Sequence, residues 1–492
     1  MDLVIQGFSV ILDPGVLIYI ICGTVLGVVF GALPGVSSAM ATMLALPFTY
    51  TMGALPAIAF LVTVYCAAIT GGSITAILFR IPGTPSSACT CLDGYPMLEQ
   101  GKAGQALGIS LIASAFGGIF SAFVMMLCTK QLAAAALKFG PTELFAVAFM
   151  GLSVMTALDA GNSLRTVISG LIGLGLACVG IDPIQGFNRL TFGSIQLMNG
   201  IEMIPVMVGL FATVEVIKQL MKRRSIDSGD VTNTSTQIRG LGLWKMKGTI
   251  LRSSVIGTVV GILPGAGATI ASFLSYAAEL KLAKDPETYG KGNPRGVAAS
   301  EAANNAATGG SMVPLLSMGI PGGNAAAVMM AAMTIKGVQM GPLLIRTQPQ
   351  FLSTVFATQI VTGILMVIVS VVIAKVFTKI LDIPYSFLGT TILMLSIIGA
   401  FATNNNITNV LIMAIASVLG VLFSKFKFSS SALVLGLVLG EICESNLRRG
   451  VLLSKTFAGF FSSPITAVLL TVSAFMLLWP VVSPYIKKKT AK

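Results

Sequence analysis

Long apolar runs, interrupted by glycine and proline, set the pattern of this chain. Such runs lie near 17–30, 104–128, 353–377 and 465–479, and an apolar run of roughly 18 residues or more can cross a bilayer as a helix. These runs do not alternate between apolar and polar residues, as the strands of a membrane β-barrel do. We therefore expect an all-α polytopic membrane protein with roughly 10 to 14 spans and shorter re-entrant pieces.

The charge-free stretch 14–79 contains too many helix breakers for two uninterrupted spans. Its pattern predicts a long helix ending near 33, a short helix over about 37–50, and a second long helix from about 54. We expect this second helix to break at Gly71-Gly72, before a short apolar piece that ends at Pro82-Gly83. Such a break leaves backbone N–H and C=O groups unpaired, which makes it a candidate functional feature.

Two motifs occur twice and in the same order. GALPG at 31–35 precedes TGGSITAILFRIPG at 70–83, and GILPG at 261–265 precedes TGGSMVPLLSMGIPG at 308–322. The chain is therefore interpreted as a duplication, with membrane halves over 1–220 and 248–492 joined by a polar linker over 221–247.

The distribution of Lys and Arg predicts the orientation of the halves. The first 79 residues contain neither, whereas 218–252 and the lysine-rich tail are strongly basic. By the positive-inside rule the linker and the tail face the cytoplasm and the N-terminus lies outside, which makes the two repeats inverted relative to each other.

Each repeated motif ends where a new helix is expected to begin. Thr84 is a good N-cap ahead of Pro85, and Asn324 is a good N-cap in the second half. A helix N-terminus offers free N–H donors and a positive dipole end, so both places are candidate anion sites. Residues 93–96 are expected to form a loop that ends the helix beginning at Pro85.

These motifs supply the candidate anion-binding residues. The first set consists of Gly71, Gly72, Ser73, Pro82, Gly83, Thr84, Ser86, Gly309, Gly310, Ser311, Pro321, Gly322, Gly323 and Asn324. A second-rank set consists of Pro34, Gly35, Ser37, Ser38, Pro264, Gly265, Gly267 and Thr269. The alternative is that the glycines only allow close helix packing and the prolines only kink helices. The pairing of each Gly-Gly-Ser with a Pro-Gly about ten residues later favours discontinuous helices that meet at a mid-membrane site.

The halves differ at one place, where Glu301, Asn304 and Asn305 precede the second Gly-Gly-Ser. Ionisable and amide side chains are costly inside a bilayer. One interpretation is that Glu301 lies near the cytoplasmic end and is solvated. The other is that the three residues bind a coupling cation, Na⁺ or H⁺, together with carbonyls freed at Gly309-Gly310. The same two interpretations apply to the polar cluster over 403–406.

Composition narrows the class further. The 492 residues are 55% hydrophobic and 10% charged, and their mean hydropathy is +0.90. The net charge of +13 suits a membrane surface better than nucleic acid, because the basic residues flank apolar runs. The chain has no His, its seven cysteines lie mostly in apolar segments, and neither paired carboxylates nor a phosphate loop is evident. We therefore expect no enzyme, no cofactor and no metal site beyond a transported Na⁺.

The motifs resemble a known family. GALPG with its following serines, GGSITAILFRIPGTPSS and LDGYPMLEQGKAGQALG resemble the large permease subunit of the bacterial tripartite tricarboxylate transporters, the TctA family. GILPGAGA and EAANNAATGGSMVPLLSMGIPGG resemble the same family. The resemblance is strong over about 23–344 and continues as a span pattern beyond it.

The resemblance implies uptake of small di- or tricarboxylates across the bacterial inner membrane, driven by a cation gradient. It also implies two partners, a small membrane subunit and a periplasmic binding protein that delivers the substrate. On this interpretation the substrate carboxylates meet N–H donors near Thr84 and Asn324. A stand-alone organic-anion exchanger or exporter is the first alternative, and a membrane channel or membrane-embedded hydrolase is a weaker one.

Overall fold

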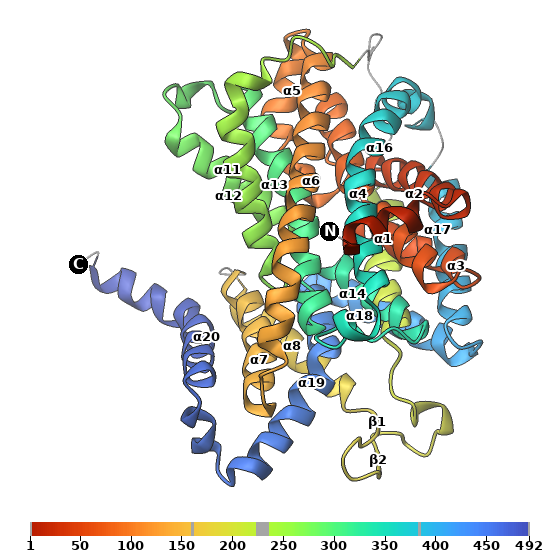
Figure 1. The fold of residues 1–492 in the computed structure, drawn as a ribbon, viewed down its shortest axis with the longest axis vertical. Helices are drawn as coiled ribbons and strands as arrows, with labels where there is room; N and C mark the ends of the chain where they lie inside the picture. Colours follow the sequence, from red (N-terminus) through yellow and green to blue (C-terminus); the bar gives the residue numbers. More distant parts are fainter. Residues whose placement is uncertain (1, 159–161, 223–235, 382–384, 491–492) are drawn as a thin grey trace.

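A computed structural model describes residues 2–158, 162–222, 236–381 and 385–490. Apart from one two-residue antiparallel strand pair, the regular structure of these residues is helical (Figure 1). The elements up to residue 222 are α1 (Asp2–Ile11), α2 (Pro14–Ala32), α3 (Ser38–Thr49), α4 (Ala54–Phe79), η1 (Pro85–Ala88), α5 (Cys91–Glu99), α6 (Ala103–Ala136), α7 (Pro141–Leu158), α8 (Ser163–Ala177), β1 (Gly180–Ile181), β2 (Asn188–Arg189), η2 (Ile195–Leu197), α9 (Met203–Met207), the π-helical η3 (Val208–Thr213) and α10 (Val214–Lys222). The later elements are α11 (Leu243–Ile262), α12 (Gly267–Leu282), η4 (Pro286–Thr288), α13 (Pro294–Met318), α14 (Asn324–Ile335), α15 (Leu344–Thr347), α16 (Pro349–Leu381), α17 (Tyr385–Ala402), α18 (Ile407–Phe426), α19 (Ser430–Ser454), η5 (Phe457–Ser462) and α20 (Pro464–Thr490).

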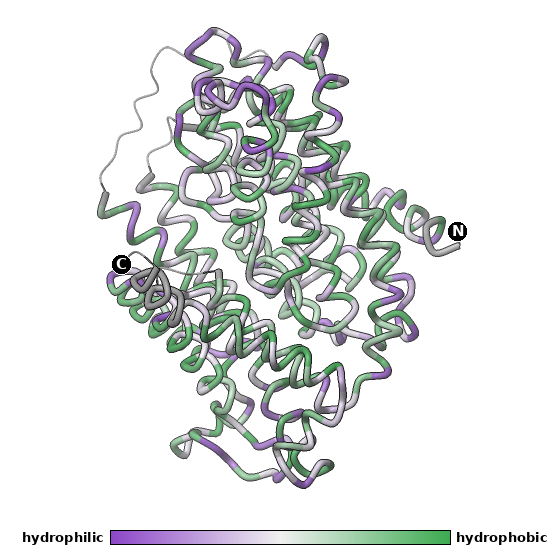
Figure 2. The backbone as a smooth tube through the Cα atoms, turned by 90° about the vertical axis from the view of Figure 1, so that its left-hand side faces the viewer, coloured by the Kyte–Doolittle hydropathy of each residue, from purple (hydrophilic) through white to green (hydrophobic). Residues whose placement is uncertain are grey.

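The all-α membrane architecture expected from the apolar runs is confirmed. Seven helices within the described residues are long and apolar enough to cross a membrane, and six shorter ones are also apolar. Figure 2 shows hydrophilic segments gathered at the two ends of the longest axis and hydrophobic segments between them. This distribution suits a protein whose middle lies in lipid.

In the first half, glycines set the distance between α2 and α4. Gly23, Gly27 and Gly31 recur every fourth residue along α2 and lie against successive turns of α4. A Cβ at Gly31 would stand 1.9 Å from the carbonyl oxygen of Ala68, so the backbones are in direct contact. Small residues at this spacing allow such contact between membrane helices, and here the two helices run parallel.

A similar packing occurs between α11 and α13. A Cβ at Gly257 would stand 2.2 Å from the carbonyl oxygen of Ala303, and one at Gly261 would stand 2.5 Å from that of Ala307. In each half the first helix ends in an LPG turn, after which a shorter helix, α3 or α12, leads to the second long helix. The expected long-short-long order over 14–79 is thus confirmed.

The predicted helix break at Gly71-Gly72 is wrong. Helix α4 runs without interruption from Ala54 to Phe79, and α13 passes through Gly309-Gly310 to Met318. A Cβ at Gly71 would stand 2.3 Å from the carbonyl oxygen of Val28, and one at Gly310 would stand 2.4 Å from that of Thr258. The glycines therefore serve close packing, and the helix keeps its internal hydrogen bonds because its buried backbone has no water to replace them.

The same contacts show which residues of the two Gly-Gly-Ser motifs occupy equivalent positions, and the pairing differs from the one that the sequence alignment of the motifs suggests. Gly71 packs on α2 as Gly310 packs on α11, so the structural counterpart of Gly71 is Gly310 and not Gly309. By the same register Gly72 corresponds to Ser311. The two Gly-Gly-Ser triplets are therefore offset by one residue in space.

The long helices of the two halves are interleaved. Helix α6, from the first half, packs along α13, and α16, from the second half, packs along α4. On α4, Thr70 contacts Asn305 of α13, whereas the earlier Tyr65 contacts the later Ser311. Helices α4 and α13 therefore run antiparallel through the middle of the molecule.

Candidate functional site

Each second long helix ends in a hairpin that folds back along it. Helix α4 stops at Arg80 and α13 stops at Gly319, both in the left-handed conformation that reverses the chain. The N–H of Gly83 then donates to the carbonyl oxygen of Gly72 at 3.2 Å, and the N–H of Gly322 donates to that of Ser311 at 3.2 Å. Each Pro-Gly thus forms the tip of a re-entrant hairpin, about two turns back from the helix end.

The tips meet the LPG turns, so the structure brings together the two motifs of each half. A Cβ at Gly83 would stand 2.1 Å from the carbonyl oxygen of Gly31, and one at Gly322 would stand 2.6 Å from that of Gly261. In the second half the N–H of Gly265 also donates to the carbonyl oxygen of Gly322 at 3.0 Å. Glycine is required at both tips because no side chain fits there.

The first tip carries buried hydroxyls. Thr84 and Ser86 are both almost fully buried, and their hydroxyls share a hydrogen bond of 2.9 Å. Thr84 occupies the predicted N-cap position, but its side chain makes no capping bond and the helix after it is the single 3-10 turn η1. The predicted loop over 93–96 is also wrong, because these residues lie inside α5.

The second tip starts the longer helix α14. Its N-cap is Gly323 and not Asn324 as predicted, and Asn324 is the first helical residue. The side chain of Asn324 instead donates to the Ser431 hydroxyl of α19 at 2.8 Å, which fixes it to a neighbouring helix. The predicted helix N-terminus is present, and the glycine leaves its first N–H groups uncovered by a capping side chain.

The remaining candidates have mainly structural partners. The Ser37 hydroxyl accepts from the N–H of Met40 and caps α3, and Gly267, with a φ of +65°, begins α12. Ser73 donates to the carbonyl oxygen of Thr70 and accepts from Ser110, so it is satisfied inside the helix bundle. Pro34, Gly35, Ser38, Gly265 and Thr269 are partly exposed, while Pro264 is buried.

Glu301 lies at the centre of a buried polar network that links α13 to helices of the first half. Its carboxylate accepts hydrogen bonds from the hydroxyls of Thr90 and Ser114, the latter at 2.9 Å, and from the amide of Asn304 at 3.2 Å. Asn304 in turn accepts from Asn305 at 2.7 Å, and the Asn305 oxygen accepts from Thr70 of α4 at 2.8 Å. The network therefore joins α4, α6, α13 and the segment after η1.

Of the two interpretations of Glu301, the one in which it is solvated is wrong, because its side chain is fully buried. Other buried carboxylates have stronger partners: Glu279 pairs with Arg252, and Asp93 accepts two backbone N–H bonds and the hydroxyl of Tyr276. Within the described residues the hydrogen-bond donors to Glu301 are neutral hydroxyls and an amide. An ionised carboxylate is costly in such surroundings, and a proton or a bound cation would offset its charge.

The carbonyls predicted to help Glu301 are not free, since α13 is continuous at Gly309-Gly310. Sequence reasoning also missed Thr70, Thr90 and Ser114, which supply three of the network's hydroxyls. Small hydroxyl residues are common in apolar helices. These three differ from the others only in their hydrogen bonds to Glu301 and Asn305 of α13, which the sequence does not reveal.

The two hairpin tips lie on opposite sides of the Thr70–Asn305 contact. Gly72 follows Thr70 on α4 and Ser311 follows Asn305 on α13, and the helices are antiparallel. The structure thus places the two tips at different levels along α4 and α13, the first near the Glu301 network and the second about two turns farther along α13.

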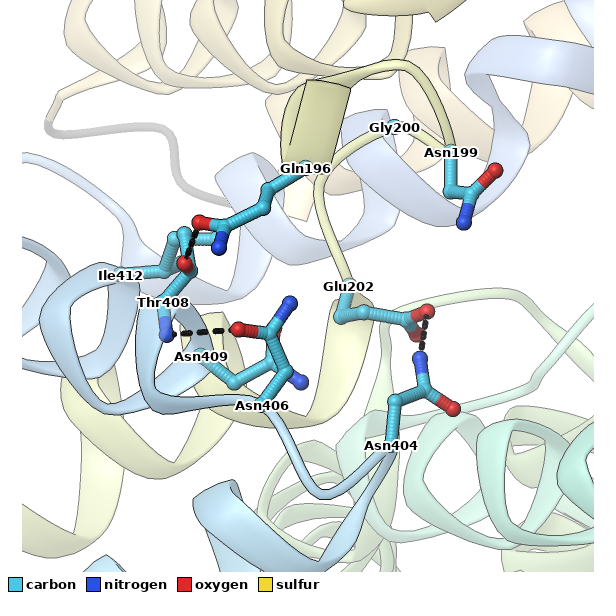
Figure 3. A pocket seen from close by; sticks show the side chains of 9 residues that line it. All are labelled: Gln196, Asn199, Gly200, Glu202, Asn404, Asn406, Thr408, Asn409 and Ile412. Carbon is cyan, nitrogen blue, oxygen red and sulfur yellow. Dashed lines mark hydrogen bonds between the residues drawn. The ribbon is translucent and has the colours of Figure 1, made fainter. Parts of the chain in front are cut away.

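A polar pocket lies elsewhere, between the segment after β2 and the turn from α17 to α18 (Figure 3). It has a volume of about 270 Å³ and includes Asn404 and Asn406 of the predicted polar cluster. A second cavity of about 290 Å³ lies between α10 and α18. Neither contains the tips or Glu301, which are closely packed in this conformation.

The fold defines a polytopic helical membrane protein with a pair of re-entrant hairpins and a buried carboxylate on one of the helices that carry them. A family model described as the tripartite tricarboxylate transporter TctA family matches residues 17–435. The chain belongs to this family, and it is a transporter subunit.

Two similar proteins come from Agrobacterium vitis. One, described as an uncharacterized 52.8 kDa protein in the TAR-I ttuC' 3' region, is 35% identical over 467 residues, which cover 95% of this chain and 93% of that protein. The other, an uncharacterized protein in the TAR-II ttuC' 3' region, is 36% identical over 215 residues, which cover 44% of this chain and 89% of that protein. No solved structure matches this chain.

Proposed function

We propose that this subunit takes up small organic anions, di- or tricarboxylates, across the bacterial inner membrane, driven by a cation gradient. The substrate arrives from a periplasmic binding protein, and a small membrane subunit completes the transporter. Family membership supports the substrate class and the partners. The burial of Glu301 among neutral donors carries the proposal of cation coupling.

The coupling cation binds at Glu301. A proton neutralises the carboxylate directly, and the neighbouring hydroxyls of Thr90 and Ser114 then accept as well as donate. A Na⁺ ion fits the same donor set by chemistry, because the Glu301 carboxylate, the amide oxygens of Asn304 and Asn305, and the hydroxyl of Thr70 are the hard oxygen ligands that such ions prefer. Either cation removes the penalty of a bare buried charge.

The substrate binds at a hairpin tip. Helix α14 begins at the second tip with uncovered N–H donors, which suit a carboxylate. Since the tips are built on the helices that hold the cation network, movement of either hairpin changes the packing around Glu301. This shared framework gives the two ligands a physical means of coupling.

The test is uptake by the complete transporter in proteoliposomes, with citrate and succinate as probes under a Na⁺ gradient or a pH gradient. Glu301→Gln keeps the shape and removes the titratable charge, so we expect gradient-driven accumulation to be lost while exchange of substrate across the membrane persists. Glu99→Gln, at an exposed position at the end of α5, is the matched control. The proposal fails if Glu301→Gln accumulates substrate normally under both gradients.

The tips are tested in the same assay. Gly83→Leu and Gly322→Leu place side chains where a Cβ alone would stand 2.1 Å and 2.5 Å from the neighbouring atoms. We expect both variants to insert into the membrane and to lose exchange as well as accumulation, which separates them from Glu301→Gln. Normal exchange by both would remove the tips from the substrate path.

A further inference from the structure

The polar pocket beside α18 has a composition that the transport of anions does not explain. Its lining consists of five amides, one carboxylate, one hydroxyl, one glycine and one isoleucine: Gln196, Asn199, Asn404, Asn406, Asn409, Glu202, Thr408, Gly200 and Ile412. The lining includes neither Lys nor Arg, the side chains that normally bind carboxylates and phosphates. Glu202 adds a negative charge that repels an anion.

One donor in this pocket is buried without a partner. Asn409 is only 3% exposed, and its Nδ2 makes no hydrogen bond within the described residues. An unpaired buried amide donor costs free energy, so its presence calls for an acceptor from outside the chain. Asn409 lies on the first turn of α18 among the lining residues (Figure 3).

The internal bonds of the pocket leave a mixed set of donors and acceptors. Asn404 donates to Glu202 at 2.6 Å, Thr408 donates to Gln196, and the Asn406 oxygen accepts from the N–H of Thr408 at 2.9 Å (Figure 3). The amide nitrogens of Gln196, Asn199 and Asn406 make no bond to the other lining residues. The second carboxylate oxygen of Glu202 and the amide oxygen of Asn404 remain as acceptors.

We propose that this pocket binds a neutral, hydroxyl-rich ligand, either a free polyol or sugar or the glycosyl headgroup of a lipid. Each hydroxyl both donates and accepts, so vicinal hydroxyls satisfy alternating amide nitrogens and oxygens without any charge. At roughly 30 Å³ per water molecule of liquid, the cavity has room for about nine waters, or for a solute of comparable size. Ile412 provides an apolar surface for the carbon skeleton.

The experiment measures equilibrium binding of sorbitol and of gluconate to the full chain, which is held in phosphatidylcholine nanodiscs in a buffer without glycerol. The two probes share a six-carbon hydroxylated chain, but gluconate carries a carboxylate. We expect saturable sorbitol binding and clearly weaker gluconate binding. Equal or tighter binding of gluconate overturns the proposal, as does the absence of saturable sorbitol binding, which would leave water as the occupant.

Two variants locate the site. Asn409→Leu removes the unpaired donor with little change of shape, and Gln196→Ala alters an exposed lining residue that cannot disturb the core. We expect each to weaken sorbitol binding roughly five- to tenfold, the value of one neutral hydrogen bond. Gln185→Ala, exposed in the same loop but outside the pocket, is the control and should bind as the wild type does. Wild-type affinity in both pocket variants rules out this site.

A second set of nanodiscs, containing a neutral monoglucosyl lipid, distinguishes the two sources. If the headgroup is the occupant, the glycolipid competes with sorbitol in the wild type and Asn409→Leu abolishes the competition; without competition, the ligand is a free solute. Glu301→Gln should bind sorbitol normally, so failure of the uptake proposal and failure of this one are separately visible.

Discussion

Glycine positions decide how closely the long helices of each half approach. At Gly31 and Gly261 the space for a Cβ is already taken by the carbonyl oxygens of Ala68 and Ala307. By contrast, a Cβ at Gly118 in the middle of α6 would meet nothing within 4 Å. The three glycines share the helical conformation, so they differ mainly in the room around them.

This difference gives a matched prediction. Gly31→Ala and Gly261→Ala should each destabilise the protein by about 1–3 kcal/mol through overpacking. Gly118→Ala should leave stability unchanged or raise it by about 0.5–1 kcal/mol, because alanine loses less entropy in a helix. Unfolding by SDS titration of the purified protein, followed by circular dichroism, measures all three. Equal effects at the three sites would show that the contacts do not limit helix approach.

Some residues of the candidate site could be predicted from the sequence, and others could not. Glu301, Asn304 and Asn305 stand out because amides and a carboxylate are rare in an otherwise apolar stretch. Their partners Thr70, Thr90 and Ser114 do not stand out, and Asn409 of the pocket is one amide among several. Side-chain contacts between distant segments depend on packing register, which local sequence does not reveal.

The β1–β2 segment is held to α19 by charge. Asp182 is buried between Arg448, at 2.6 Å, and Arg189, at 3.4 Å, and its Oδ1 accepts from the N–H groups of Ile184 and Gln185. Burial alone would raise the pKa of Asp182, but the bonds from Arg448 and the two N–H groups outweigh it and lower the pKa to about 2.

The sign of this shift predicts how the segment responds to pH. The pKa of Asp182 in the folded protein lies below the value of about 3.9 for a free Asp. The stabilisation that its ionised carboxylate gives to the folded segment is therefore complete above about pH 3.9 and is lost as the pH falls through about 2. Asp182→Asn should imitate the acid state at neutral pH and increase cleavage of the segment by added protease. Gln185→Ala is the control. Unchanged cleavage in Asp182→Asn would mean that the charges do not hold the segment.

For the helices, the sequence predicted several of the ends correctly but wrongly predicted interruptions within α4 and α13. The glycine and proline interruptions located the end of α2, both ends of α3 and the start of α4 correctly, since these residues act locally on the backbone. The paired glycines in α4 and α13 indicated a break, but tertiary packing against α2 and α11 overrides their low helix propensity. A sequence pattern does not distinguish a glycine that ends a helix from one that admits a neighbour.

On the scale of the whole molecule, the contacts define two ends. At one end Gln100 donates to the carbonyl oxygen of Lys291, which joins the turn after α5 to the segment before α13. Toward the opposite end lies the turn after α14, where Lys336 donates to the carbonyl oxygens of Tyr50 and Met52 ahead of α4. Because α4 and α13 are antiparallel, the turn after the first hairpin lies beside the start of α13, and the turn after the second hairpin lies beside the start of α4.

The turns after the two hairpins therefore test the inverted duplication. Gly101 follows α5 and Gly337 follows α14, and both are exposed with positive φ and open space around them, so an inserted reporter is tolerated structurally. In a parallel duplication the two turns share one side of the membrane, whereas in an inverted one they face opposite sides. We expect a reporter after Gly101 to be cytoplasmic, because Lys102, Lys291 and Arg295 make that end basic. A reporter after Gly337 should be periplasmic, and detection of both reporters on one side would rule out the inverted arrangement.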